Sequence, residues 1–126
     1  KNFFEWIASS AEENKDVRLF NDQFVNQISN WTAADFFAKM LQLPQPEATL
    51  HIGSHDVLSK ADVAKMILNR YPNYQGKLEE VSVDSVGDGL YHPKQMWLNT
   101  DKAASLFSAM PRTEEELQKI WNSHQQ

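Results

Sequence analysis

The segment ATLHIGSHDVLSKADVAKM, residues 48–66, constrains the fold more than any other part of the chain. A short apolar run from Thr49 to Ile52 predicts a strand, and a Gly-Ser-His loop leads from it towards a helix. Ser59 is followed three residues later by Asp62, a capping pattern that predicts a helix beginning at Ser59. A strand that passes through a short loop into a capped amphipathic helix is half of an α/β unit.

Four further helices are predicted from apolar residues at helical spacing and from capping residues. They cover residues 2–14, 32–43 and 100–107, and a last helix opens at Thr113. Thr32 is the expected cap of the helix at 32–43, because Asp35 lies three residues later as the second half of a capping box. The buried stripe of this helix should consist of Phe36, Phe37, Met40 and Leu41.

Extended structure is expected in two more places. Val17 to Phe20 is typical of a short strand, and the amide-rich residues 21–30 that follow should form a connection. Apolar residues at Leu78, Val81, Val83 and Val86 indicate further extended structure, which ends in a turn at residues 87–89. The predicted fold class is α/β, or α+β by content, with about five helices and three or four short strands in a single domain, residues 1–126.

The composition excludes several classes of protein. Twelve Lys and Arg against seventeen Asp and Glu give a net charge of −5. The basic residues form no stripe that could follow a phosphate backbone, so we expect no nucleic acid partner. No apolar run approaches the roughly 20 residues that cross a bilayer, so we expect no membrane partner. With no cysteine and no signal segment, the expected location is the cytoplasm.

The chain shows no pattern for binding a cofactor or a metal, or for nucleophilic catalysis. Its four glycines do not form the G-x-G-x-x-G turn that lets a pyrophosphate approach a helix N-terminus. His51 and His55 are four residues apart, but one is predicted in a strand and the other in a loop, which argues against a shared metal. Ser54, His55 and Asp56 are adjacent and so cannot form a catalytic relay. We therefore predict no catalytic, cofactor-binding or metal-ligating residues.

Several motifs, taken in order, resemble one known family. They are Asp22-Gln-Phe24, the capped helix at 32–43, the segment HIGSHDVLSKADVAKMI at 51–67, and Pro93 followed by Leu98-Asn-Thr-Asp-Lys102. This order and spacing resemble the C-terminal portion of extended short-chain dehydrogenase/reductases of the dTDP-4-dehydrorhamnose reductase type. The resemblance runs over nearly the whole chain and implies the C-terminal fragment of an extended Rossmann-type reductase.

In that family the N-terminal Rossmann half binds NAD(P)H and carries a catalytic tyrosine with a lysine four residues later. Tyr71, Tyr74 and Tyr91 all lack a lysine at that spacing. The chain also begins at Lys1 and not at a methionine, which favours a piece of a longer protein. The resemblance therefore implies that the N-terminal NAD(P)-binding part, which makes most contacts with NAD(P)H, is absent from this chain.

The resemblance also indicates where a nucleotide-sugar substrate would bind. It places the loop amides Gln23, Asn26 and Gln27 near the substrate, and amides suit hydroxyl and carbonyl groups. Each of them is equally well explained as an ordinary loop amide. It places His92 and Lys94 near the nucleotide diphosphate. The family commonly has arginine at the position of His92 and proline at that of Gln27, so the identity of the sugar stays open.

Two hypotheses follow. In the first, the chain is the nucleotide-sugar binding portion of an NAD(P)-dependent reductase and is inactive alone. In the second, it is a non-catalytic regulatory or protein-interaction module of the same fold family, as His92 in place of arginine would favour. In both, elements that normally pack against a missing half expose strand edges and apolar faces, so we expect a homo-oligomer.

Overall fold

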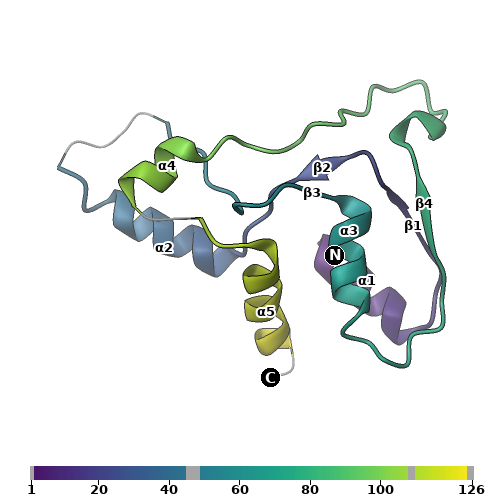
Figure 1. Cartoon of the computed structure of the whole chain (residues 1–126). Helices are drawn as coiled ribbons and strands as arrows, with labels where there is room; N and C mark the ends of the chain where they lie inside the picture. The colour runs from purple at the N-terminus through teal and green to yellow at the C-terminus, as the bar shows by residue number, and fades with distance from the viewer. Residues whose placement is uncertain (1, 45–48, 108–109, 125–126) are drawn as a thin grey trace. The chain divides into compact units, whose positions relative to one another are not determined.

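The computed structural model describes residues 2–44, 49–107 and 110–124. Within them the chain forms five α-helices and four short strands (Figure 1), which confirms the predicted fold class. The chain divides into two compact units. Unit 1 comprises Lys1–Val25 and Leu58–Met96, and unit 2 comprises Asn26–Val57 and Trp97–Gln126. Each unit is described by itself.

Two capped helices, α1 (Phe3–Glu12) and α3 (Lys60–Leu68), pack against each other in unit 1. Asn2 caps α1 through a reciprocal capping box with Glu5. Ser59 caps α3, as predicted, because its Oγ accepts a hydrogen bond of 3.1 Å from the Asp62 N–H. The apolar faces of the two helices are buried through Phe4, Ile7, Ala8, Ala11, Val63, Ala64, Ile67 and Leu68.

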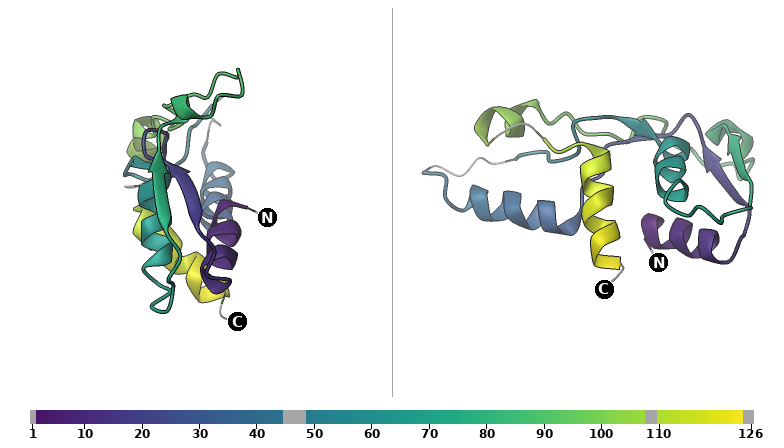
Figure 2. Two further views of the ribbon diagram at one scale, coloured as in Figure 1. Left: turned by 90° about the vertical axis from the view of Figure 1, so that its right-hand side faces the viewer. Right: turned by 60° about the horizontal axis from the view of Figure 1, so that its bottom comes forward.

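The strands of unit 1 form two small sheets (Figure 2). The predicted strand β1 (Val17–Phe20) is confirmed and lies parallel to β4 (Leu78–Val81), with Val17 opposite Leu78. β2 (Phe24–Val25) runs antiparallel to β3 (Leu58–Ser59). The polar connection predicted at 21–30 therefore contains a strand, because β3 supplies backbone partners for it. Since β3 leads directly into α3, the crossover from β1 to β4 carries this helix against the sheet.

The chain leaves β4 through a short 3₁₀ helix, η1 (Val83–Ser85). The prediction of extended structure at Val83 is therefore wrong. The Ser82 Oγ accepts a hydrogen bond of 3.1 Å from the Asp84 N–H, and this cap turns the backbone into η1. Val83 is nevertheless buried, so its side chain belongs to the core, as the spacing of the apolar residues in this segment indicated.

Unit 2 contains α2 (Asn30–Met40), α4 (Asp101–Leu106) and α5 (Thr113–His124). The helices predicted at 100–107 and from Thr113 are present, although the Thr100 side chain makes no capping hydrogen bond. α2 and α4 share an apolar cluster of Phe36, Ala103 and Met110, packed by Ile52, Ala104 and Phe107. The rings of Phe36 and Phe107 meet edge to face, with their centroids 5.7 Å apart.

The predicted start and buried stripe of α2 are both wrong in part. Ser29, and not Thr32, is the cap, because the Ser29 Oγ accepts the Thr32 N–H at 3.2 Å; the helix ends at Met40. Phe36 is buried, but Phe37 is 62% exposed and Leu41 is 73% exposed. Helical spacing correctly groups Phe37 and Leu41 on one face, but neither belongs to the apolar cluster described for this unit.

The strand predicted from Thr49 to Ile52 is absent. A strand needs a neighbour to complete its hydrogen-bond ladder, and no described residue pairs with this run as a strand. Ile52 instead packs on the apolar cluster of unit 2. Gly53 follows it, and a Cβ at this position would lie 2.7 Å from Nδ2 and from the backbone oxygen of Asn26.

No helix in the described part of the chain is long and apolar enough to cross a membrane.

Candidate functional site

A hollow of unit 1 lies in the segment that follows β4. It has a volume of about 540 Å³ and is lined by residues between Val83 and Gln95. Gly87 and Gly89 have φ angles of 67° and 74°, in the left-handed region that glycine adopts without a steric cost. We call residues 83–95 the Gly87 loop.

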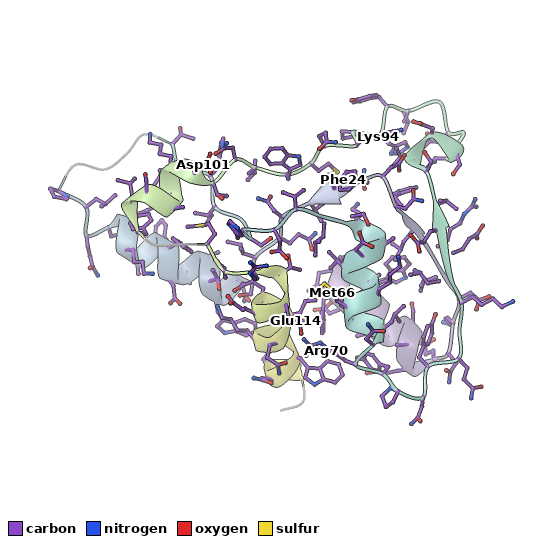
Figure 3. The ribbon with its side chains drawn as sticks, viewed as in Figure 1. Phe24, Met66, Arg70, Lys94, Asp101 and Glu114 are labelled. Atoms are coloured by element: carbon purple, nitrogen blue, oxygen red, sulfur yellow. The ribbon has the colours of Figure 1, made fainter. Side chains whose placement is uncertain are left out.

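Hydrogen bonds anchor both ends of the Gly87 loop. At its start, the Asp22 carboxylate accepts hydrogen bonds from the Ser82 hydroxyl at 2.6 Å and from the Val83 N–H at 2.9 Å. At its end, β2 pairs with the loop, because Phe24 N–H donates to the Lys94 carbonyl at 2.7 Å. Figure 3 labels Phe24 and Lys94, which lie close together there. The loop is therefore held at its base while its tip is open.

Asp22 is strongly acidic. The hydrogen bond from the Ser82 hydroxyl, followed by that from the Val83 N–H and the neighbouring Lys94 ammonium, lowers the pKa of Asp22 to about 2. Asp22 therefore carries a full negative charge at neutral pH. The sequence motif containing Asp22 was part of the family resemblance, but its role in shaping the loop depends on partners about 60 residues away, and no local pattern indicates it.

Lys94, one of the predicted diphosphate contacts, lies between two carboxylates. Its Nζ is 2.6 Å from Asp84 Oδ2 and 3.1 Å from Asp22 Oδ2. The hydrogen bonds to Asp84 and then Asp22 raise the pKa of Lys94 above its usual value. The ammonium is thus fully charged, but its charge is already matched by two acidic groups.

His92, the second predicted diphosphate contact, pairs with an acid of the same loop. Its Nε2 lies 2.8 Å from Asp88 Oδ2, and its side chain is 30% exposed. The Leu90 N–H, followed by His92, hydrogen-bonds Asp88 and lowers the pKa of this carboxyl. The His92 ring also lies beside Phe20 of β1, with ring centroids 6.5 Å apart. The i, i+4 spacing of Asp88 and His92 is the one sequence signal that could have indicated this pair.

Two large side chains at the tip of the Gly87 loop face solvent. Leu90 is 72% exposed and Tyr91 is 88% exposed. An exposed tyrosine offers a flat, amphipathic surface on which a planar ring can stack. In the sequence, Tyr91 could be compared only with a catalytic tyrosine, and no pattern assigned it to binding.

Gln23 joins the same region from the β1–β2 connection. It is 4% exposed, and its Nε2 donates a hydrogen bond of 2.9 Å to the Pro93 carbonyl. Its Oε1 is buried without a hydrogen-bond partner among the described residues. Gln23, His92 and Lys94 therefore belong to one unit and to one loop system.

Asn26 and Gln27, the remaining predicted contacts, belong to unit 2. Asn26 is buried, and its amide bonds to the backbone of Leu98 and to the Ser54 carbonyl. Gln27 is exposed. The resemblance assigned both amides to the substrate, but Asn26 is buried and bonded to the backbone, whereas Gln27 is exposed.

No group of three or more His, Asp or Glu that could hold a metal ion occurs within 2–44, 49–107 and 110–124. The side chains of His51 and His55 are both exposed. Ser54 is buried, and its hydroxyl donates to the Asp56 carbonyl at 2.9 Å.

Comparison with solved structures gives close matches in fold. dTDP-4-dehydrorhamnose reductase from Bacillus anthracis str. Ames, in complex with NADP, matches 98% of this chain and 43% of its own length, with a TM-score of 0.84 and 20% identity. The Clostridium acetobutylicum ATCC 824 enzyme of the same name matches 100% of this chain and 45% of its own length, with a TM-score of 0.86 and 16% identity. A dTDP-glucose 4,6-dehydratase from Bacillus anthracis str. Ames, in complex with NAD, matches 94% of this chain and 37% of its own length, with a TM-score of 0.72 and 15% identity.

This chain spans less than half the length of each of these proteins. No curated protein matches the sequence. The model of the RmlD substrate binding domain matches residues 1–125, almost the entire chain. The resemblance proposed from the sequence motifs is confirmed: the chain belongs to the RmlD substrate binding domain family.

Proposed function

We propose that this chain is the nucleotide-sugar binding part of an NAD(P)-dependent reductase of the dTDP-4-dehydrorhamnose reductase type, and that it does not transfer hydride by itself. The observation that carries the proposal is the family match over residues 1–125. The NADP complex of the Bacillus anthracis reductase, similar in fold, supports NAD(P)H as the cofactor of the parent protein.

The described residues do not fit a dinucleotide. A pyrophosphate site needs glycines that open directly onto a helix N-terminus. Gly87 and Gly89 lie on an open loop, and the next helix, α4, begins only at Asp101. NAD(P)H, bound by residues outside this chain, would supply the hydride. The residues of this chain would bind and orient the sugar nucleotide.

The Gly87 loop is the proposed contact with the nucleotide diphosphate. Its hollow of about 540 Å³ falls in the size range of small-ligand sites. Tyr91 offers a ring surface for the base, and His92 lines the hollow beside it. Gln23 and Gln27 stay candidates for hydroxyl groups of the sugar, since the buried Gln23 Oε1 has no hydrogen-bond partner among the described residues and the Gln27 amide is exposed.

Binding and catalysis can be tested separately. Titration calorimetry with dTDP-glucose should show saturable, one-to-one binding to the 126-residue chain. NADPH and a 4-keto sugar nucleotide, mixed with the same chain, should show no loss of NADPH absorbance. Full reductase activity would refute the proposal that the chain is inactive alone. Failure to bind dTDP-glucose at any pH would refute its role as the substrate-binding part.

A second candidate function is a non-catalytic regulatory or protein-interaction module. It is favoured by Lys94, whose charge is matched by Asp22 and Asp84 and so is not open to a diphosphate. The sequence encoded upstream of Lys1 would discriminate the two. A glycine-rich turn followed by Tyr-x-x-x-Lys there supports the reductase, and the lack of both supports the regulatory module.

We also propose that the chain self-associates. Phe37 of α2 and Leu41, the residue that caps the C-terminal end of this helix, lie four residues apart and are both mostly exposed, so they form an apolar strip on one face. A second copy of the chain presents the same strip, and burying the two strips against each other would remove both from water.

A further inference from the structure

The Gly87 loop is a poor anion site while its histidine is neutral. The loop and its base carry three carboxylates, Asp22, Asp84 and Asp88, together with Lys94 and His92. With His92 neutral, three carboxylates oppose a single ammonium, and protonation of His92 reduces this excess of negative charge. A diphosphate is therefore repelled more strongly when His92 is neutral.

The Lys94 ammonium cannot easily overcome this excess of negative charge. Its ammonium contacts Asp84 at 2.6 Å and Asp22 at 3.1 Å. To bind a phosphate oxygen it would have to leave at least one of these carboxylates uncompensated. Asp22 is the less replaceable partner, since it also holds the Ser82 hydroxyl and the Val83 N–H at the base of the loop.

His92 is the remaining group that can gain positive charge. Because the pKa of Asp88 is lowered, its carboxylate is ionised and can only accept a hydrogen bond. The 2.8 Å contact therefore places a hydrogen on His92 Nε2. In the neutral ring, Nδ1 then carries a lone pair, which repels a phosphate oxygen. After protonation Nδ1 becomes a second donor.

The surroundings of His92 leave Nδ1 open to a ligand. Within the described residues no hydrogen bond engages Nδ1, and the side chain is 30% exposed. His92 lines the hollow, as do its neighbours Tyr91 and Pro93. The neighbouring element, β1, contributes the uncharged Phe20 ring, and the charged groups of the cluster are Asp88, Asp84, Asp22 and Lys94.

We infer that the Gly87 loop binds a nucleotide diphosphate more tightly when His92 is protonated, so that binding weakens as the pH rises. His92 Nδ1–H donates to a phosphate oxygen while Nε2–H stays on Asp88. Asp88 is a positioning residue: it fixes the tautomer and stabilises the imidazolium. This inference rests on the proposed function, because it concerns the same ligand and the same loop.

The test is calorimetric binding of dTDP-glucose by the full 126-residue chain at about pH 6 and about pH 8. A diphosphate esterified at both ends keeps the same charge over this range, so the ligand itself contributes no pH dependence. The lower pH stays above the sequence pI of about 5.3, where precipitation would interfere. We expect affinity to be about tenfold or more weaker at the higher pH, because loss of the imidazolium removes a charge-assisted hydrogen bond to the phosphate.

Matched variants identify the residue responsible. His92→Arg should bind about equally at both pH values, since arginine keeps its charge. His92→Gln should bind weakly at both, at least about tenfold below the wild type at pH 6. Asp88→Asn should move the half-maximal pH downwards. The control is His51→Gln, an exposed histidine of unit 2, which should keep the wild-type pH dependence. Circular dichroism verifies that each variant is folded.

Each result has a defined meaning. Equal wild-type affinity at both pH values would overturn the inference and leave the proposed function standing. A wild-type pH dependence that persists in His92→Arg would also overturn it. No binding at any pH would overturn the proposed function, and the inference with it. The predicted loss of pH dependence in His92→Arg, with the downward shift in Asp88→Asn, would support both.

Discussion

The side-chain amide of Asn26 pairs with the backbone of Leu98 through two hydrogen bonds. Nδ2 donates to the Leu98 carbonyl at 2.8 Å, and Oδ1 accepts from the Leu98 N–H at 2.9 Å. The same Nδ2 lies 3.3 Å from the Ser54 carbonyl, which it can also bond. The amide therefore satisfies both the N–H and the C=O of a backbone residue 72 positions further along the chain.

Asn26→Ala should destabilise the fold, and Gln27→Ala should not. Removing the Asn26 amide breaks both bonds to Leu98, so we expect a loss of about 2 kcal/mol in the free energy of unfolding. Gln27 is exposed, so its truncation should cost about 0.5 kcal/mol or less. Urea denaturation at neutral pH measures both. Equal stabilities of the two variants would show that the Asn26 bonds are not important for the fold.

Glu116 should link the stability of unit 2 to pH. Its carboxylate is buried and accepts hydrogen bonds from the Ser29 N–H at 2.6 Å and the Thr32 hydroxyl at 2.7 Å, and it pairs with Lys119 at 2.8 Å. Burial raises the pKa of Glu116, but hydrogen bonds from Lys119, Ser29 and Thr32 together outweigh burial, and the pKa is lowered overall.

Because the folded-state pKa is below the ordinary 4.5, the stabilisation by Glu116 is present above about pH 4.5 and is lost as the pH falls through the lowered value. Glu116→Gln should cost about 1–3 kcal/mol at neutral pH. It should also reduce the further loss of stability on acidification. Glu114→Gln, on the exposed side of the first turn of α5, is the matched control and should change stability by about 0.5 kcal/mol or less. The measurement is urea denaturation at several pH values.

Asp22 should control the opening of the Gly87 loop. In Asp22→Asn the charge that holds the Ser82 hydroxyl and Val83 N–H is lost, so we expect faster hydrogen exchange at the Val83 amide, by about tenfold or more. In the wild type, protection by Asp22 is present above its ordinary pKa of 3.8 and lost as the pH falls towards about 2. Asp84→Asn is the control, because it removes a Lys94 contact and leaves the Val83 bond intact. Unchanged Val83 exchange in Asp22→Asn would contradict this role.

Phe37→Glu should weaken self-association. Burial of a phenylalanine side chain contributes about 1.5–3 kcal/mol, so its replacement by a charged residue should raise the dissociation constant by about tenfold or more. Ala38→Glu adds the same charge at the next exposed position of α2 and should have a smaller effect. Light scattering coupled to size-exclusion chromatography measures the mass over a range of concentrations. A wild-type chain that stays monomeric at every concentration would refute the self-association.

Local interactions explain which parts of the fold were predictable. Ser59 and Asp62 are three residues apart, so the cap of α3 and the direction of its buried face could be inferred before any tertiary contact was known. The strand at Val17 was predicted for a similar reason, since the alternation of its side chains depends only on adjacent residues. The run from Thr49 to Ile52 has comparable apolarity, but no described strand lies beside it.

The candidate site was only partly predictable, because its chemistry depends on contacts far apart in the sequence. The family motifs indicated His92 and Lys94. They did not indicate that Asp22 and Asp84 would hold Lys94, and a lysine in this position contributes less to anion binding than a free one.

The sequence by itself determined the family, the set of helices and the Ser59 cap of α3, because these depend on residue types at short, fixed spacing. Only the tertiary structure decided the roles of Asn26 and Glu116, because the backbone partners of Asn26 and the Ser29 and Thr32 partners of Glu116 lie between 28 and 87 residues away. It also left Phe37 exposed while burying Phe36. A side chain is buried or paired according to what folding places opposite it, and adjacent residues do not carry that information.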